Sequence, residues 1–124
     1  VKLCDFGLSE PFFMNTTRKW SCNRFCGKTQ YASPEVMSRT PDFDAKSNDI
    51  FCLGVCLFML IIGCAPWESA EKKDAGFRCI INGQLKDVLN KWHKLSCVTD
   101  EIIELLNSFF KYEHERITLS ELKT

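Results

Sequence analysis

The sequence predicts a single, mainly α-helical domain built around one buried central helix. Residues 50–64 contain no charged, amide or hydroxyl side chain, so they favour a buried position. Two later segments, 85–92 and 99–110, place apolar residues three and four positions apart, which is the spacing of one helix face. With 124 residues, the chain has room for one domain that buries about two-thirds of its unfolded surface.

The apolar run 50–64 is the predicted central helix. It is too long for an ordinary strand, and Gly63 and Pro66 are typical of a helix end. The residues before it supply capping groups and a negative charge: Ser47, Asn48 and Asp49. A helix apolar on every side is either a core helix or a membrane span. At roughly 22 Å the run is shorter than the ~30 Å hydrocarbon core, so we predict a core helix and no membrane span.

Shorter elements are expected on both sides of this helix. Val1 to Cys4 predicts a short strand that leads into a glycine turn at Gly7. Residues 9–27 lack periodicity and are long for a plain connection, which favours a functional loop. Ala75 to Ile81 form a short apolar segment, which Gly83 ends.

Two further helices follow. The first places its apolar face at Leu85, Val88, Leu89 and Trp92. The second begins at a cap on Thr99 or Asp100, and its predicted stripe is Ile102, Leu105, Leu106 and Phe109, widened by Ile103 and Phe110. Thr118 and Glu121 have the spacing of a capping box at the start of a last helix.

Charge and cysteine content narrow the function classes. Sixteen basic side chains balance sixteen acidic ones, which argues against a nucleic-acid binder that relies on a positive field. The eight cysteines lie mostly among apolar residues and no secretory signal is visible, so we expect free thiols and no stoichiometric zinc. The expected location is intracellular and cytoplasmic, with export of the parent protein as an open alternative.

Five short motifs follow one another along the chain. They are Asp5-Phe6-Gly7, Ser33-Pro34-Glu35, Asp49-Ile50-Phe51-Cys52-Leu53-Gly54, Gly63-Cys64-Ala65-Pro66-Trp67, and Arg116 followed by Glu121-Leu122. In this order they resemble the C-terminal lobe of the eukaryotic protein kinases, with serine in place of alanine in the second motif and phenylalanine in place of tryptophan in the third. The resemblance implies a protein kinase-like fold, C-terminal lobe only, with an activation segment at 5–35 and a helical part at 36–124.

The same resemblance implies roles for several residues. Asp5 is expected to hold Mg²⁺ that bridges the phosphates of ATP, as part of a cofactor-binding Asp5-Phe6-Gly7 in which Phe6 packs beneath the site. Glu35 and Arg116 are expected to form a buried ion pair below the substrate loop. Asp49 is expected to hydrogen-bond the backbone of the catalytic loop, with simple helix capping as the alternative.

The substrate loop departs from the family pattern. Lys28 stands where serine/threonine kinases usually carry a small hydroxyl residue, and Thr29 follows it. Tyr31 stands where those kinases carry tyrosine, which favours serine or threonine as the acceptor. Arg24 occupies the usual activating phosphosite, so the candidate switch sites are Thr16, Thr17 and Ser21, with ordinary loop hydroxyls as the alternative. Residues 26–28 and 80–92 are also similar to the FIKK kinases of apicomplexan parasites.

The sequence contains no glycine-rich ATP loop, no phosphate-pairing lysine strand and no His-Arg-Asp motif. We therefore predict a fragment of a serine/threonine kinase that passes the γ-phosphate of ATP to protein hydroxyls and is inactive alone. Its partners are then a protein substrate and the N-lobe and catalytic loop of the same kinase. The alternatives are a pseudokinase or non-catalytic protein-binding lobe, and a zinc module made of Cys22, Cys26, His93 and Cys97, whose spacing is loose for zinc.

Overall fold

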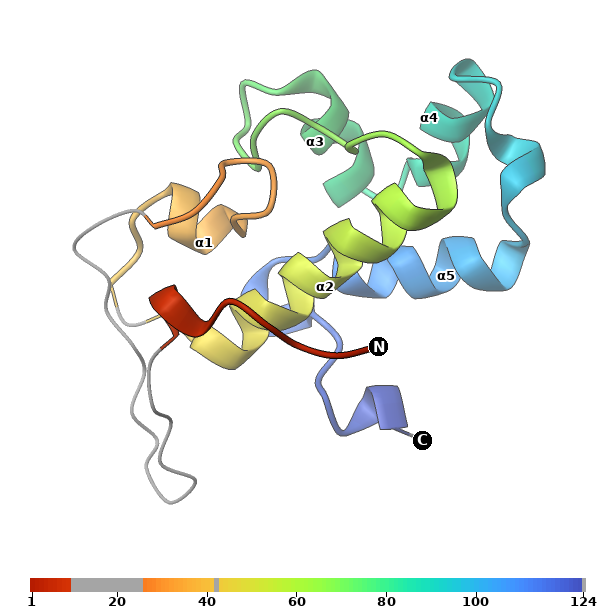
Figure 1. Ribbon diagram of the computed structural model, residues 1–124. Helices are drawn as coiled ribbons and strands as arrows, with labels where there is room; N and C mark the ends of the chain where they lie inside the picture. The colour runs from red at the N-terminus through yellow and green to blue at the C-terminus, as the bar shows by residue number, and fades with distance from the viewer. Residues whose placement is uncertain (10–25, 42, 124) are drawn as a thin grey trace.

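The computed structural model describes residues 1–9, 26–41 and 43–123, and these form helices joined by loops (Figure 1). The α-helices are α1 (Pro34–Met37), α2 (Ala45–Ile62), α3 (Ala75–Ile81), α4 (Leu85–Lys91) and α5 (Asp100–Phe109). Short 3₁₀ turns lie at Phe6–Leu8, Leu95–Cys97, Glu113–Glu115 and Glu121–Lys123. The mainly helical prediction is confirmed over these residues.

The predicted strand at Val1–Cys4 is wrong. These residues adopt neither helix nor strand, and their side chains are exposed. A strand needs a neighbouring strand for its backbone hydrogen bonds, and none lies within the described ranges. An apolar, β-prone tetrapeptide is therefore not sufficient to make a strand here.

Helix α2 runs diagonally through the middle of the molecule, with α1 on one side, α3 and α4 on another, and α5 packed against it (Figure 1). It begins earlier than predicted. The cap is Asp44, whose carboxylate accepts a hydrogen bond from the Lys46 N–H at 2.9 Å, so residues 47–49 lie inside the helix. The predicted end is confirmed: Gly63 takes a left-handed backbone, with φ at 84°, and its N–H bonds the Met59 carbonyl at 2.9 Å.

Only part of the α2 surface is buried, so the prediction of burial on every side is wrong for this chain. The buried residues include Phe51, Val55 and Phe58, all fully covered. The opposite stripe of Leu53, Cys56, Leu60 and Cys64 is exposed, and Leu60 is 83% exposed. An apolar composition predicts a helix that prefers burial, but it does not determine which sides meet a neighbour.

Among the described helices, α2 is the one with the length and apolar composition needed to cross a membrane, and 33% of that stretch is buried inside the structure. The central helix of a globular domain meets the same criterion, so this is weak evidence for a span. The expectation of no membrane span stays a prediction.

Helix α5 packs its apolar stripe against α2. Thr99 caps it, with its hydroxyl accepting from the Ile102 N–H at 3.4 Å, as the sequence predicts. Its buried residues are Ile103, Leu106 and Phe109. Leu105, predicted on the buried stripe, is instead 37% exposed. Ile103, predicted at the edge of the stripe, is buried, and Phe109 packs closely on Gly54 of α2.

Aromatic rings fill the space between α2, α3 and the C-terminal segment. The Trp67 ring lies 4.9 Å from the Phe110 ring, 5.3 Å from Phe77 and 5.6 Å from Phe51 between centroids. Helix α4 contributes its predicted residues Leu85, Val88 and Leu89, all buried. The fourth predicted residue of that face, Trp92, is 37% exposed and meets Phe58 edge-on at 6.3 Å.

Gly54 should be the position in α2 least tolerant of a larger side chain. A Cβ there would lie 2.5 Å from the Phe109 Cβ and 2.8 Å from its Cγ. Gly54→Ala should gain up to about 1 kcal/mol of helix propensity but lose about 1–3 kcal/mol by forcing α2 and α5 apart. We expect a net loss of stability, measured by urea unfolding.

The matched control is Cys56→Ala, one half-turn away on the exposed side of the same helix, which should change the stability by less than about 0.5 kcal/mol. Equal midpoints for Gly54→Ala and the wild type would contradict the close packing of α2 on α5.

Candidate functional site

The structure brings Glu35 and Arg116 together, 81 positions apart in the sequence. Pro34 starts α1 at a position where its missing N–H costs nothing, and this places Glu35 in the first turn. The Arg116 guanidinium bonds both carboxylate oxygens of Glu35, with Nη1 to Oε1 at 2.6 Å and Nη2 to Oε2 at 3.0 Å. Both residues are buried, so the pair is a two-pronged ion pair shielded from water.

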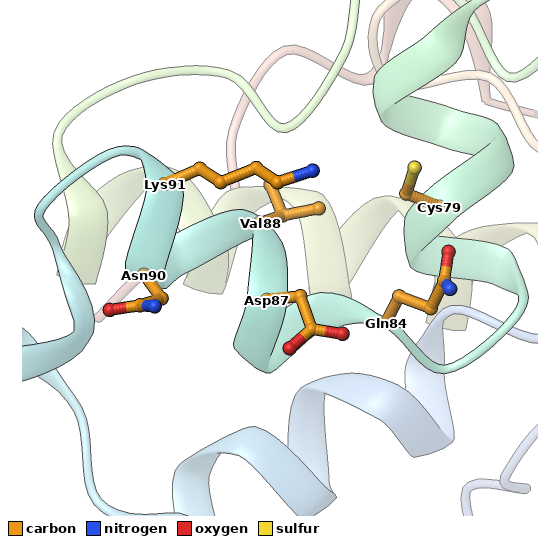
Figure 2. A pocket seen from close by; sticks show the side chains of 6 residues that line it. All are labelled: Cys79, Gln84, Asp87, Val88, Asn90 and Lys91. Atoms are coloured by element: carbon orange, nitrogen blue, oxygen red, sulfur yellow. The ribbon is translucent and has the colours of Figure 1, made fainter.

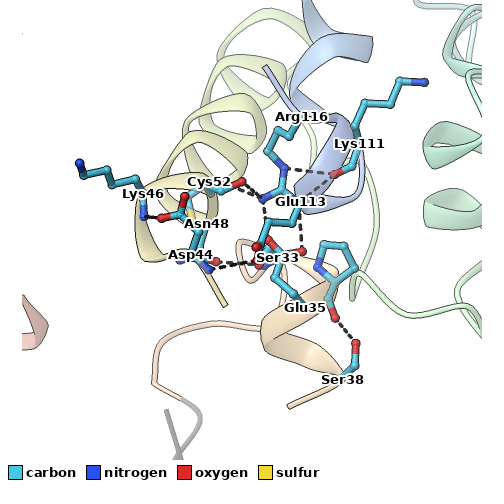
Figure 3. Close-up of polar contacts among 12 residues, drawn as sticks. Ser33, Glu35, Ser38, Asp44, Lys46, Asn48, Cys52, Lys111, Glu113 and Arg116 are labelled. Carbon is cyan, nitrogen blue, oxygen red and sulfur yellow. Dashed lines mark hydrogen bonds and ion pairs between the residues drawn. The ribbon is translucent and has the colours of Figure 1, made fainter. Parts of the chain in front are cut away.

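Arg116 also donates hydrogen bonds to groups other than Glu35. Its Nη1 donates to the Ser47 carbonyl at 2.9 Å and to the Ser47 hydroxyl at 3.0 Å. Its Nε and Nη2 donate to the Lys111 carbonyl at 3.1 and 2.8 Å, and its planar head lies 4.8 Å from the centre of the Phe51 ring. Figure 3 shows this group between α1, α2 and the C-terminal segment. A buried guanidinium with an acceptor for every nitrogen joins the three segments.

A second contact ties the C-terminal segment to the start of α2. The Glu113 carboxylate accepts a hydrogen bond from the Asp44 backbone N–H at 3.0 Å (Figure 3). Asp44 caps α2, so Glu113 satisfies a donor that the helix leaves unpaired. The sequence offers no local sign of this contact, because the two residues are 69 positions apart.

The loop of residues 28–33, the expected substrate loop, is held to α2 and to the turn after it. Lys28 and Thr29 are exposed and Tyr31 is half-buried. Thr29 Oγ1 donates a hydrogen bond to the Glu68 carbonyl at 3.2 Å, and Trp67 Nε1 donates to the Gln30 carbonyl at 3.1 Å. The Cys52 thiol donates to the Tyr31 carbonyl at 3.2 Å, and the Ser33 N–H donates to Asn48 Oδ1 at 3.4 Å. The sequence alone did not assign this role to Cys52, Trp67 or Asn48.

Asp5, Phe6 and Gly7 lie in an exposed segment. Asp5 has a left-handed backbone, with φ at 62°, and precedes the 3₁₀ turn Phe6–Leu8. Phe6 is 65% exposed, so its expected packing beneath a site is not met within the described residues. Residues 10–25, which form most of the connection from this segment to loop 28–33, lie outside the described residues.

Asp49 lies exposed in the first half of α2. Partial desolvation raises the pKa of its carboxyl above the ordinary value. The structure places no catalytic loop beside it, so the expected hydrogen bond to that loop stays a prediction. The candidate phosphosites Thr16, Thr17 and Ser21 lie outside the described residues.

Cysteine placement differs from the expectation of burial in apolar surroundings. Cys52 is half-buried, whereas Cys56, Cys64 and Cys97 are exposed. Across residues 1–9, 26–41 and 43–123, no group of three histidine, cysteine or acidic side chains is arranged to hold a metal ion. Cys22 of the zinc alternative lies outside those ranges, so that alternative gains no support.

A hollow of about 230 Å³ lies between α3 and α4, away from all the predicted site residues (Figure 2). Its lining mixes a thiol, two amides, a carboxylate and an ammonium group around one apolar side chain: Cys79, Gln84, Asn90, Asp87, Lys91 and Val88. None of these belongs to the five motifs between Asp5 and Leu122 that carry the resemblance to protein kinases.

Comparison with known proteins agrees with the motifs. A family model described as protein kinase domain matches residues 1–124. Serine/threonine-protein kinase SRK2C of Arabidopsis thaliana is 34% identical over 125 residues, covering 99% of this chain and 34% of that protein. Serine/threonine-protein kinase SAPK7 of Oryza sativa subsp. japonica is 29% identical over 124 residues, covering 99% of this chain and 33% of that protein. The chain spans about a third of the length of the curated relatives it matches.

The narrower resemblance to the FIKK kinases is not confirmed by these comparisons and stays a hypothesis. The broader resemblance rests on motifs distributed from Asp5 to Arg116, and the matched region covers the same residues. The fold is helical throughout its described elements, as expected for the C-terminal lobe. The chain belongs to the eukaryotic protein kinase family.

Proposed function

We propose that this chain is the C-terminal-lobe part of a serine/threonine protein kinase that transfers the γ-phosphate of ATP to hydroxyl groups of protein substrates. The proposal rests on the anchoring of loop 28–33. This loop leads into α1, where Glu35 forms its buried ion pair with Arg116. A kinase must hold its acceptor peptide in line with the phosphate, because phosphoryl transfer depends on positioning. Tyr31 and the names of the relatives support serine or threonine as the acceptor.

Asp5 suits a magnesium site. Its carboxylate is a hard oxygen ligand and is exposed to solvent, so a cation can reach it. It would supply one ligand, and the other ligands would come from the phosphates of ATP, water and parts of the kinase outside the described residues. Bound Mg²⁺ would neutralise charge that develops on the transferred phosphate. The segment 5–35 would then be the activation segment, with Thr16, Thr17 and Ser21 as its candidate switch sites.

A second candidate function is a non-catalytic lobe that binds another protein. The exposed apolar stripe of α2, with Leu53, Cys56 and Leu60, favours it, because exposed apolar surface often marks an interface. The intact Asp5-Phe6-Gly7 argues for the enzyme, since a lobe used only for binding has no need of a metal ligand.

Phosphotransfer to a pool of serine, threonine and tyrosine peptides distinguishes these functions. The isolated chain should transfer no phosphate from ATP, because it lacks the lysine and catalytic loop that the family uses. The complete kinase polypeptide should phosphorylate serine or threonine peptides, and removal of Mg²⁺ by EDTA should abolish the reaction. A complete polypeptide that binds no nucleotide and transfers no phosphate would support the non-catalytic lobe instead.

A further inference from the structure

Two donors from separate parts of the core hold adjacent carbonyls of loop 28–33. The Trp67 indole Nε1 donates to the Gln30 carbonyl at 3.1 Å, and the Cys52 thiol donates to the Tyr31 carbonyl at 3.2 Å. The Gln30 carbonyl belongs to the peptide plane before Tyr31 and the Tyr31 carbonyl to the peptide plane after it, so the two bonds together fix the direction of the backbone at Tyr31. The peptide planes on either side of Tyr31 cannot rotate without breaking one of these two hydrogen bonds.

The Trp67 donor is held in place by the core. Its ring is 5% exposed and packs against Phe51, Phe77 and Phe110 at 4.9 to 5.6 Å between centroids. The indole N–H has no acceptor capacity and a fixed direction, so its position follows from the packing of the ring. The Trp67 N–H therefore holds the Gln30 carbonyl at a fixed position against the core.

The Cys52 donor lies in α2, about two turns after the Asp44 cap. Burial raises the pKa of its thiol to about 12, with the nearby Asp49 carboxylate acting in the same direction. The thiol therefore remains protonated at neutral pH and keeps its S–H donor. A thiol is a weak donor, but here it points at a carbonyl in a half-buried place where water competes little.

We propose that Trp67 and Cys52 are positioning residues, which set the path of loop 28–33 and thereby the place where an acceptor peptide is held. This rests on the proposed function. Neither side chain needs to touch the substrate, since both act through the loop backbone. The proposed role of Trp67 is that of a hydrogen-bond donor. It is distinct from core packing, because the ring packs in the core whether or not its N–H donates a hydrogen bond.

Substitutions at the two donors test their role in the complete kinase. Trp67→Phe keeps an aromatic ring but removes the N–H, and Cys52→Ala removes the thiol, whereas Cys52→Ser keeps a donor. Losing one such bond should raise the KM for the peptide substrate by about 2- to 10-fold and leave the KM for ATP unchanged. Cys52→Ser should restore most of the peptide KM. Cys97→Ala, an exposed cysteine in the turn Leu95–Cys97, is the control and should change neither constant.

Hydrogen exchange gives a second readout that needs no activity. Trp67→Phe and Cys52→Ala should speed exchange of the amides in residues 29–33 and leave those of α5 unchanged. Unchanged loop exchange, or a peptide KM equal to the wild type despite faster exchange, would overturn the proposal. A parallel rise in both KM values with a lower unfolding midpoint would show a packing role and also overturn it.

Failure of the proposed function can be distinguished from failure of the donor role of Trp67 and Cys52. A complete polypeptide with no phosphotransfer would overturn the kinase assignment, and with it substrate positioning, while the exchange data would still decide whether the two donors hold the loop.

Discussion

Replacing Arg116 with Met in the complete kinase polypeptide should lower the free energy of unfolding by about 3 to 5 kcal/mol. The substitution removes the two guanidinium donors that bond the buried Glu35 carboxylate at 2.6 and 3.0 Å and leaves a buried charge without its ion-pair partner. It also strips donors from the carbonyls of Ser47 and Lys111. Glu35→Gln should cost a comparable amount, because Arg116 then keeps a buried charge. Urea unfolding followed by circular dichroism measures both.

An exposed pair of nearly equal length serves as the control. Lys86 and Asp100 lie 2.7 Å apart on the surface, and Lys86→Met should cost only about 0 to 1 kcal/mol. The Glu35→Gln, Arg116→Met double variant should lose less than the sum of the two single changes, because each single change already breaks the pair. Single changes that are near neutral and additive would mean that the pair contributes nothing to stability.

Replacing Asp5 with Asn should reduce kcat of the complete kinase by at least about 100-fold, since the reaction depends on positioned charge. The amide keeps the shape of the carboxylate but not its charge, so it binds a hard cation weakly. Asn also tolerates the left-handed backbone found at this position, with φ at 62°, so the fold should be unaffected. The measurement is kcat at saturating ATP over a range of Mg²⁺ concentrations.

Asp87→Asn is the control for charge removal, because Asp87 is an exposed acid on α4 and belongs to none of the five motifs between Asp5 and Leu122. It should leave kcat at the wild-type value. An Asp5→Asn enzyme with wild-type turnover at low Mg²⁺ would remove Asp5 from the metal site.

Features that depend on neighbouring residues could be predicted from the sequence. The end of α2 at Gly63 and the cap of α5 at Thr99 follow from local backbone chemistry. The capping-box spacing of Thr118 and Glu121 also predicts what is found: the Glu121 carboxylate accepts from the Thr118 N–H at 2.8 Å. The helix expected after it is a single 3₁₀ turn.

The family resemblance predicted the Glu35–Arg116 ion pair, which is confirmed, but other features that depend on distant residues could not be predicted. Several residues between positions 44 and 49 can cap a helix, so sequence alone leaves the start of α2 ambiguous. The structure begins the helix at Ala45, where Glu113 accepts from the Asp44 N–H across 69 positions. The same limit applies to the exposed stripe of α2 and to the loop contacts of Cys52 and Trp67, whose partners lie far away in the chain.

The long sequence separation between Glu35 and Arg116 has a consequence for biosynthesis. A ribosome adds roughly 5–20 residues per second, so the 81 positions between them take roughly 4–16 s to synthesise. Throughout that time Arg116 has not been made, so the Glu35 carboxylate lacks its buried partner and stays in water. Helix α1 is thus the first described α-helix to leave the ribosome and among the last to be fixed. A nascent chain that stops before Arg116 leaves it unanchored.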